Sequence, residues 1–151
     1  MKVRVVVVGK AREPHLAAMI AEYETRAARY WPLEVLEVRE ETGRPIEEVR
    51  AREGERLLSR AASALVVACD EKGEAMTSRA FATWLQSLRE GARDVAFLIG
   101  GAHGLDPRVR TSAARQLLLA PWTLPHEMAR VVLAEQLYRA GTIVRREPYH
   151  K

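Results

Sequence analysis

The sequence predicts an α/β domain in which helices cover both faces of a mostly parallel sheet. Short apolar or β-branched runs alternate with longer segments of helical spacing, an order typical of parallel sheets. The predicted strands cover about residues 2–8, 33–39, 65–69, 95–99 and 116–120. No internal repeat or change in composition marks a linker, so residues 1–151 are expected to form a single domain.

Helices are predicted between these strands. One begins near Pro14 and ends before Pro32, and a surface helix follows in the charged stretch around residues 48–61. A third begins at Thr77 or Ser78, and Asp106 followed by Pro107 suits the start of a short fourth helix. The last helix is expected from about 126 to 141, followed by a tail of some ten residues.

Composition excludes several classes of protein. Hydrophobic residues make up 48% and charged residues 29% of the 151-residue chain, which excludes a disordered or membrane-embedded protein. The pattern of a secretory signal is absent near Met1, so a cytoplasmic protein is expected. A single cysteine, Cys69, predicts neither an internal disulfide nor a metal site. The net charge of +4 is compatible with an RNA partner without requiring one.

Three predicted strand ends have unusual sequences. They are Ala68-Cys69-Asp70, the glycine-rich segment 100–104 and the segment 120–125. Ligands of open α/β sheets gather at the carboxyl ends of the strands. If the three strands are parallel, their loops converge on one crevice.

Two of these loops each allow two interpretations. Residues 100–104 read Gly-Gly-x-x-Gly after the fourth strand, whereas the dinucleotide fingerprint is G-x-G-x-x-G after the first. The paired glycines are either a tight turn or a surface without side chains against which a ligand lies. The segment from Pro121 to Pro125 is either a rigid backbone edge for a heteroaromatic ring such as adenine or a loop packed beneath the last helix.

The last predicted helix carries polar residues that are open to a structural or a functional interpretation. His126 starts it and either faces the crevice or caps the helix. Glu135 and Arg139 have i, i+4 spacing, which is typical of an ordinary surface salt bridge.

Six ordered motifs, read together, resemble the RlmH family over essentially the whole chain. They are Val7-Val8-Gly9-Lys10, Leu98-Ile99-Gly100-Gly101-x-x-Gly104-Leu105, Thr123-Leu124-Pro125-His126, Arg130-Val131, Glu135-Gln136-Leu137-Tyr138-Arg139-Ala140 and Pro148-Tyr149-His150. The resemblance implies a SPOUT-type fold with a C-terminal trefoil knot and a homodimer. It also implies methylation of N3 of a pseudouridine in a hairpin of large-subunit rRNA, with S-adenosylmethionine (S-adenosyl-L-methionine) as cofactor and no metal.

The resemblance also assigns residues by position. The cofactor pocket would be formed by Cys69, Gly100, Gly101, Leu119, Ala120, Pro121, Trp122, Thr123 and Leu124. The residues around the target base would be His126, Arg130, Glu135, Arg139, Tyr149 and His150, some of them supplied by the second subunit. Cys69 and Gly141 stand where the family usually has larger apolar residues. The glycine is therefore expected to shorten or loosen the last helix.

The expected reaction is a direct methyl transfer, because a sulfonium donor is already activated and the protein mainly aligns the reactants. Arg145, Arg146 and Lys151 are expected to contact phosphates, and an assembled ribosome is the expected form of the substrate. Two other functions compete with this one. A non-catalytic rRNA- or ribosome-binding factor would bind RNA without the cofactor. A nicotinamide-dependent oxidoreductase is disfavoured by the glycine spacing.

Overall fold

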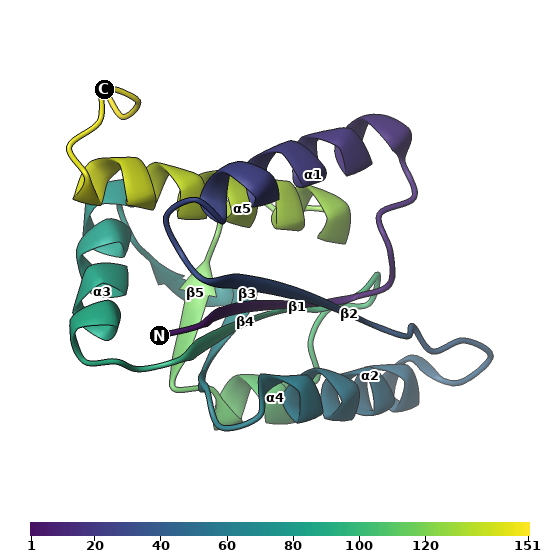
Figure 1. Cartoon of the computed structure of the whole chain (residues 1–151). Coiled ribbons are helices and arrows are strands. Elements are labelled where there is room, and N and C mark those ends of the chain that lie inside the picture. The colour runs from purple at the N-terminus through teal and green to yellow at the C-terminus, as the bar shows by residue number, and fades with distance from the viewer.

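The computed structural model describes residues 1–151 and places five parallel strands between two layers of helices (Figure 1). The strands are β1 (Val3–Val8), β2 (Leu33–Val38), β3 (Leu65–Ala75), β4 (Val95–Ile99) and β5 (Arg115–Leu118), in the order β2-β1-β4-β3-β5. The helices are α1 (Pro14–Ala27), α2 (Ile46–Ala61), α3 (Ser78–Glu90), α4 (Pro107–Ser112) and α5 (His126–Val144). The predicted fold class, a parallel α/β sheet covered on both faces, is confirmed.

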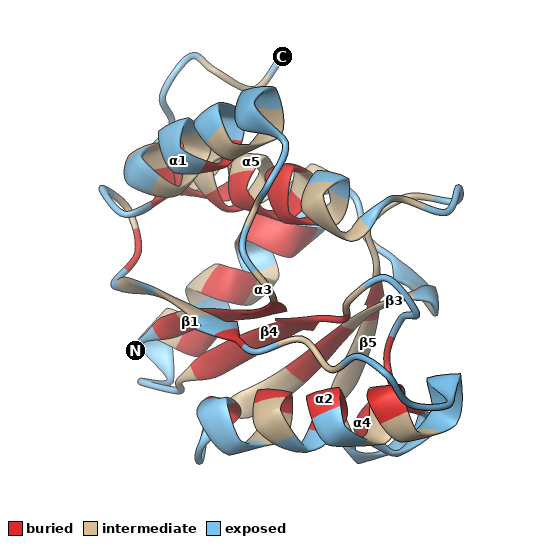
Figure 2. Cartoon of the chain, turned by 90° about the vertical axis from the view of Figure 1, so that its right-hand side faces the viewer, coloured by how far each residue is buried: buried red, intermediate tan, exposed pale blue.

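The sheet is buried on both sides because alternate residues of its strands pack against different helices. On β1, Val5 and Val7 belong to the larger core beneath α1, α3 and α5, whereas Val6 and Val8 belong to the core beneath α2 and α4. Every residue of β4 is buried, as the colouring of the central strands in Figure 2 shows. Such strands read as continuous apolar runs, which is why they could be located from the sequence.

β3 is longer than predicted. The polar run after Cys69 indicated an end to the strand, but β3 continues to Ala75 through an irregularity between Cys69 and Glu74. The added part pairs with β5, with Glu74 opposite Leu117. A Cβ atom at Gly73 would lie 2.6 Å from the backbone carbon of Leu117, so only glycine permits this approach. Pairing with an edge strand leaves no apolar pattern in the sequence, and the prediction therefore missed it.

Gly141 neither ends nor loosens the last helix, contrary to the prediction. α5 continues to Val144, and Gly141 is buried against Tyr30, which follows α1. A Cβ atom at this position would lie 2.3 Å from Cγ of Tyr30, so the missing side chain lets the end of α1 approach α5. Close helix packing at this point, rather than helix termination, explains the glycine.

None of the helices has the length and apolar character needed to cross a membrane.

Candidate functional site

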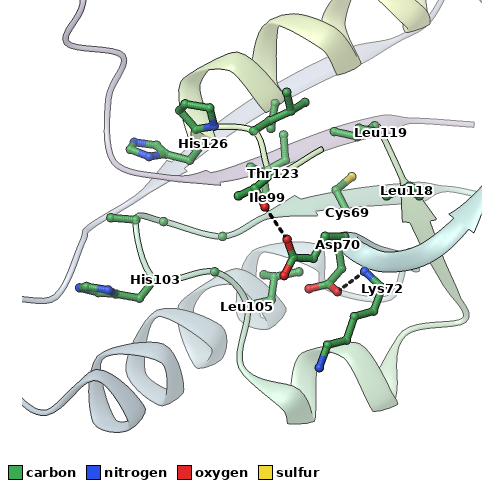
Figure 3. Close-up of a pocket in the computed structure, with 18 of the residues that line it drawn as sticks. Cys69, Asp70, Lys72, Ile99, His103, Leu105, Leu118, Leu119, Thr123 and His126 are labelled. Atoms are coloured by element: carbon green, nitrogen blue, oxygen red, sulfur yellow. Dashed lines mark hydrogen bonds between the residues drawn. The ribbon is translucent and has the colours of Figure 1, made fainter. Parts of the chain in front are cut away.

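The middle of β3, at residues 69–72, and the carboxyl ends of β4 and β5 open into one cavity of about 860 Å³ (Figure 3). Its walls come from the segments 69–72, 99–105, 118–120 and 122–126, together with Arg50, Arg110 and Ala129. The predicted convergence of the three strand ends is thereby confirmed. The volume lies in the range of pockets that bury a cofactor-sized ligand.

The glycine loop forms one wall of the cavity. A Cβ atom at Gly100 would lie 2.6 Å from the backbone carbon of Gly104, and Gly104 itself has a φ of +78°. The N–H of Gly104 donates to the carbonyl of Gly101 at 3.0 Å and closes the loop. Gly100–Leu105 is therefore both a tight turn and a wall whose first two residues present no side chain to the cavity.

The segment after β5 forms the opposite wall. Leu119, Ala120, Thr123 and Leu124 line the cavity, as does Trp122, although 80% of the Trp122 surface is exposed. Pro121 is exposed and is absent from the lining. The Thr123 hydroxyl donates to Oε2 of Glu71 at 2.9 Å, which ties this loop to β3 (Figure 3). The loop stays largely exposed rather than packed beneath α5. Its use as a backbone edge for a heteroaromatic ring stays a prediction.

Charged groups of both signs surround this partly apolar cavity. Burial, reinforced by the neighbouring Asp70, raises the pKa of the Cys69 thiol to about 12, so Cys69 stays neutral at physiological pH. Asp70 lies 3.5 Å from the Arg110 guanidinium, and Arg50 donates to the carbonyl of His103 at 2.6 Å. Lys72 is exposed at the same rim.

Sequence reasoning missed these charged rim residues. Asp70 and His103 lie within the segments singled out, and Lys72 follows one of them closely, so all three could have been included. No feature of the sequence indicated Arg50, because it lies on α2, which precedes all three segments that were singled out as the site.

The structure separates Arg130 from the cavity. His126, at the start of α5, lines the cavity, whereas Arg130 is buried against α1 and β2. Its Nε and Nη2 donate to the two carboxylate oxygens of Glu24 at 2.7 and 3.3 Å, and Nη1 lies 3.5 Å from Glu37. Within one chain, Arg130 therefore joins α5 to α1 and β2.

The other four predicted residues form a cluster near the end of α5. Arg139 donates to Oε1 of Glu135 at 2.6 and 2.9 Å, and Tyr149 donates to the same oxygen at 3.0 Å. Nδ1 of His150 lies 3.3 Å from Nη1 of Arg139. Burial and the hydrogen bond to Glu135 raise the pKa of Tyr149, so its hydroxyl remains a donor. At 1.5 Å of rise per residue, Arg139 lies about 20 Å along α5 from His126, and no member of this cluster lines the cavity.

Comparisons with known proteins identify the family. The family described as "Predicted SPOUT methyltransferase" matches residues 1–150. A Gemmatimonas aurantiaca protein named "Ribosomal RNA large subunit methyltransferase H" is 62% identical over 154 residues, with all of both chains covered. A Geobacter sulfurreducens protein of the same name is 46% identical over 153 residues, covering 99% of each chain. The chain belongs to the RlmH family of SPOUT methyltransferases.

Structural similarity supports the fold. A probable methyltransferase from Bordetella pertussis Tohama I aligns with a TM-score of 0.58 and 14% identity, covering 92% of this chain and 95% of that one. The predicted family, fold class and reaction class, a methyl transfer, are confirmed. The trefoil knot stays a prediction.

Proposed function

We propose that this enzyme methylates N3 of a pseudouridine in a hairpin of large-subunit rRNA, acting in the cytoplasm on the assembled ribosome. The observation that carries the proposal is the cavity shared by β3, the glycine loop after β4 and the segment after β5, in a chain that belongs to the RlmH family. The names of the relatives support large-subunit rRNA as the substrate.

The residues of the cavity fit S-adenosylmethionine. Gly100 and Gly101 form a wall without side chains. A Cβ atom at Gly100 would clash with the backbone of Gly104. Leu119, Ala120, Leu124 and the neutral Cys69 supply apolar surface for an adenine, and the charged rim suits an amino-acid group. Trp122 and Thr123 complete the proposed pocket, and Pro121 shapes its backbone. When bound, S-adenosylmethionine supplies an activated methyl group that becomes bonded to N3 as its bond to sulfur breaks.

The remaining predicted residues act on the target base. Arg139 and Tyr149 hold Glu135 in a fixed position, and the raised pKa of Tyr149 keeps its hydroxyl protonated, so that it donates to Glu135 and does not accept the proton from the base. The proton that leaves N3 passes to His126, His150 or Glu135, the three candidate acceptors. Arg130 has a positioning role through its contacts with Glu24 and Glu37.

The distance between His126 and the Glu135–Arg139–Tyr149–His150 cluster along α5 supports a homodimer. His126 lies at the cavity, whereas the Glu135–Arg139–Tyr149–His150 cluster lies up to about 20 Å away along the same helix. A complete site therefore takes the cavity from one subunit and the cluster from the other. Sedimentation of the purified protein as a monomer at working concentration would contradict this arrangement.

Two measurements test the function itself. Titration calorimetry should show saturable binding of S-adenosylmethionine and none of a nicotinamide dinucleotide. Mass spectrometry of rRNA from a strain lacking the protein should show loss of one methyl group from a large-subunit pseudouridine. A non-catalytic binding factor would leave the methylation intact and would give no cofactor signal.

A complementation experiment tests the shared site. Ala120→Phe would fill the cavity, and Tyr149→Ala would disable the cluster, so each variant alone should be inactive. If the site is shared, a 1:1 mixture after subunit exchange regains about a quarter of the wild-type sites, since half the dimers carry one intact site. No recovery in a mixture shown to contain heterodimers would contradict the shared site.

A further inference from the structure

Two arginines meet around Tyr30, where the ends of α1, α3 and α5 come together. Arg89 of α3 donates to the carbonyl of Tyr30, and its guanidinium lies 4.0 Å from the centre of the Trp31 ring. Arg145, just after α5, lies 4.7 Å from the centre of the Tyr30 ring and donates to the carbonyl of Arg29 at 3.3 Å. Each guanidinium is therefore held by one aromatic ring and one carbonyl.

Neither guanidinium has a carboxylate partner. Other arginines of the chain do, as Arg130 with Glu24 and Arg139 with Glu135 illustrate. Glu147 is close to this region, but it accepts the hydroxyl of Tyr30 and forms no ion pair with Arg145. Burial and the positive charge of Arg145 both lower the pKa of Arg89, as expected where two cations surround the same residue, Tyr30. The fold keeps two cations together with no anion of its own between them.

We propose that Arg89 and Arg145 bind a backbone phosphate of the RNA, an inference that rests on the proposed function. A guanidinium has five N–H donors, and each of these two has a single hydrogen-bonded acceptor in the structure, so donors remain for an oxyanion. Because both are already oriented, little side-chain freedom is lost when a phosphate binds. The exposed side chains of Arg29 and Arg146 extend the positive surface without ion pairs of their own.

This phosphate site is remote from the cavity of the same chain. α5 has 19 residues between His126 and Val144, which corresponds to about 28 Å. Neither guanidinium contacts a residue of the Glu135–Arg139–Tyr149–His150 cluster either, since their partners are the carbonyls and rings of residues 29–31. A contact at Arg89 and Arg145 therefore positions the RNA and takes no part in the chemistry or in reading a base. Loss of the pair is expected to raise KM for RNA while leaving kcat and the affinity for S-adenosylmethionine unchanged.

The test uses Arg89→Gln, Arg145→Gln and the double variant, which keep part of each side-chain stem. Arg79→Gln is the matched control, because Arg79 is an exposed arginine of α3 whose side chain has no ion pair. Binding to undermethylated large ribosomal subunits is measured between 50 and 200 mM salt, a range in which such contacts change strongly. Each substitution should lower the slope of log affinity against log salt by about one and weaken binding about tenfold at the low-salt end. The control should match wild type.

The outcomes separate this inference from the proposed function. Variants that bind subunits with the wild-type slope and affinity overturn the phosphate site and leave the methyltransferase assignment standing. Wild-type protein that binds S-adenosylmethionine but neither binds nor methylates subunits overturns both. A double variant that loses cofactor affinity together with RNA affinity would show a defect of folding and would also refute the positioning role.

Discussion

Replacing Arg130 distinguishes a positioning role from a direct catalytic one. Arg130→Met keeps most of the side-chain volume and removes the guanidinium, whose side chain is 9% exposed. The carboxylates of Glu24 and Glu37 then lose their shared partner while remaining 17% and 35% exposed. Two partly buried like charges are left facing each other, and the protein is expected to be less stable.

The magnitude follows from this burial. Breaking a fully buried ion pair from one side costs about 3–5 kcal/mol. Glu24 and Glu37 can still turn partly towards water, so we expect a smaller loss of about 2–3 kcal/mol in the free energy of unfolding. For a chain of this size, that loss lowers Tm by about 4–12 °C.

Urea unfolding and a thermal scan measure the effect. Arg52→Ala is the matched control, because it removes an exposed i, i+4 partner of Glu48, and such pairs contribute about 0.3–0.5 kcal/mol. Adding both Glu24→Gln and Glu37→Gln to the Arg130→Met protein should restore most of the lost free energy of unfolding. An Arg130→Met protein as stable as wild type yet inactive would refute the positioning role and place Arg130 at the reacting base.

Three further predictions concern Glu53, Cys69 and Gly141. Oε1 of Glu53 is buried without a hydrogen-bond partner, and burial raises the pKa of this carboxyl. The folded state therefore binds more protons than the unfolded state, and the free energy of unfolding falls as the pH rises above the ordinary carboxyl range. Glu53→Gln should therefore unfold at higher urea than wild type at pH 8, with the difference shrinking towards pH 4. With its pKa near 12, the Cys69 thiol should resist iodoacetamide at pH 8 in the folded protein, as followed by mass spectrometry, and rapid alkylation would contradict this. Gly141→Leu should cost about 1–3 kcal/mol in urea unfolding through its clash with Tyr30, and the cost should shrink in a Tyr30→Ala background.

Local patterns in the sequence were sufficient for the layers of the fold. The buried valines of β1 and the all-apolar β4 could be located because a strand buried on both faces needs a continuous apolar run. The capping prediction for α3 was also confirmed, since the Thr77 hydroxyl accepts the N–H of Ala80 at 3.1 Å. The extension of β3 could not be predicted, because its stability comes from pairing with β5, some forty residues away.

The sequence by itself determined the α/β fold class, the family and the three segments that meet at the cavity, because strand burial and parallel order place those segments at one edge of the sheet. Tertiary structure alone decided what the polar side chains of α5 and its neighbours contact. It paired Arg130 with Glu24, gathered Glu135 with Tyr149, and brought both Arg89 and Arg145 into contact with Tyr30. Such contacts depend on where the ends of separate helices lie in space, and the spacing of residues along a single helix does not predict those positions.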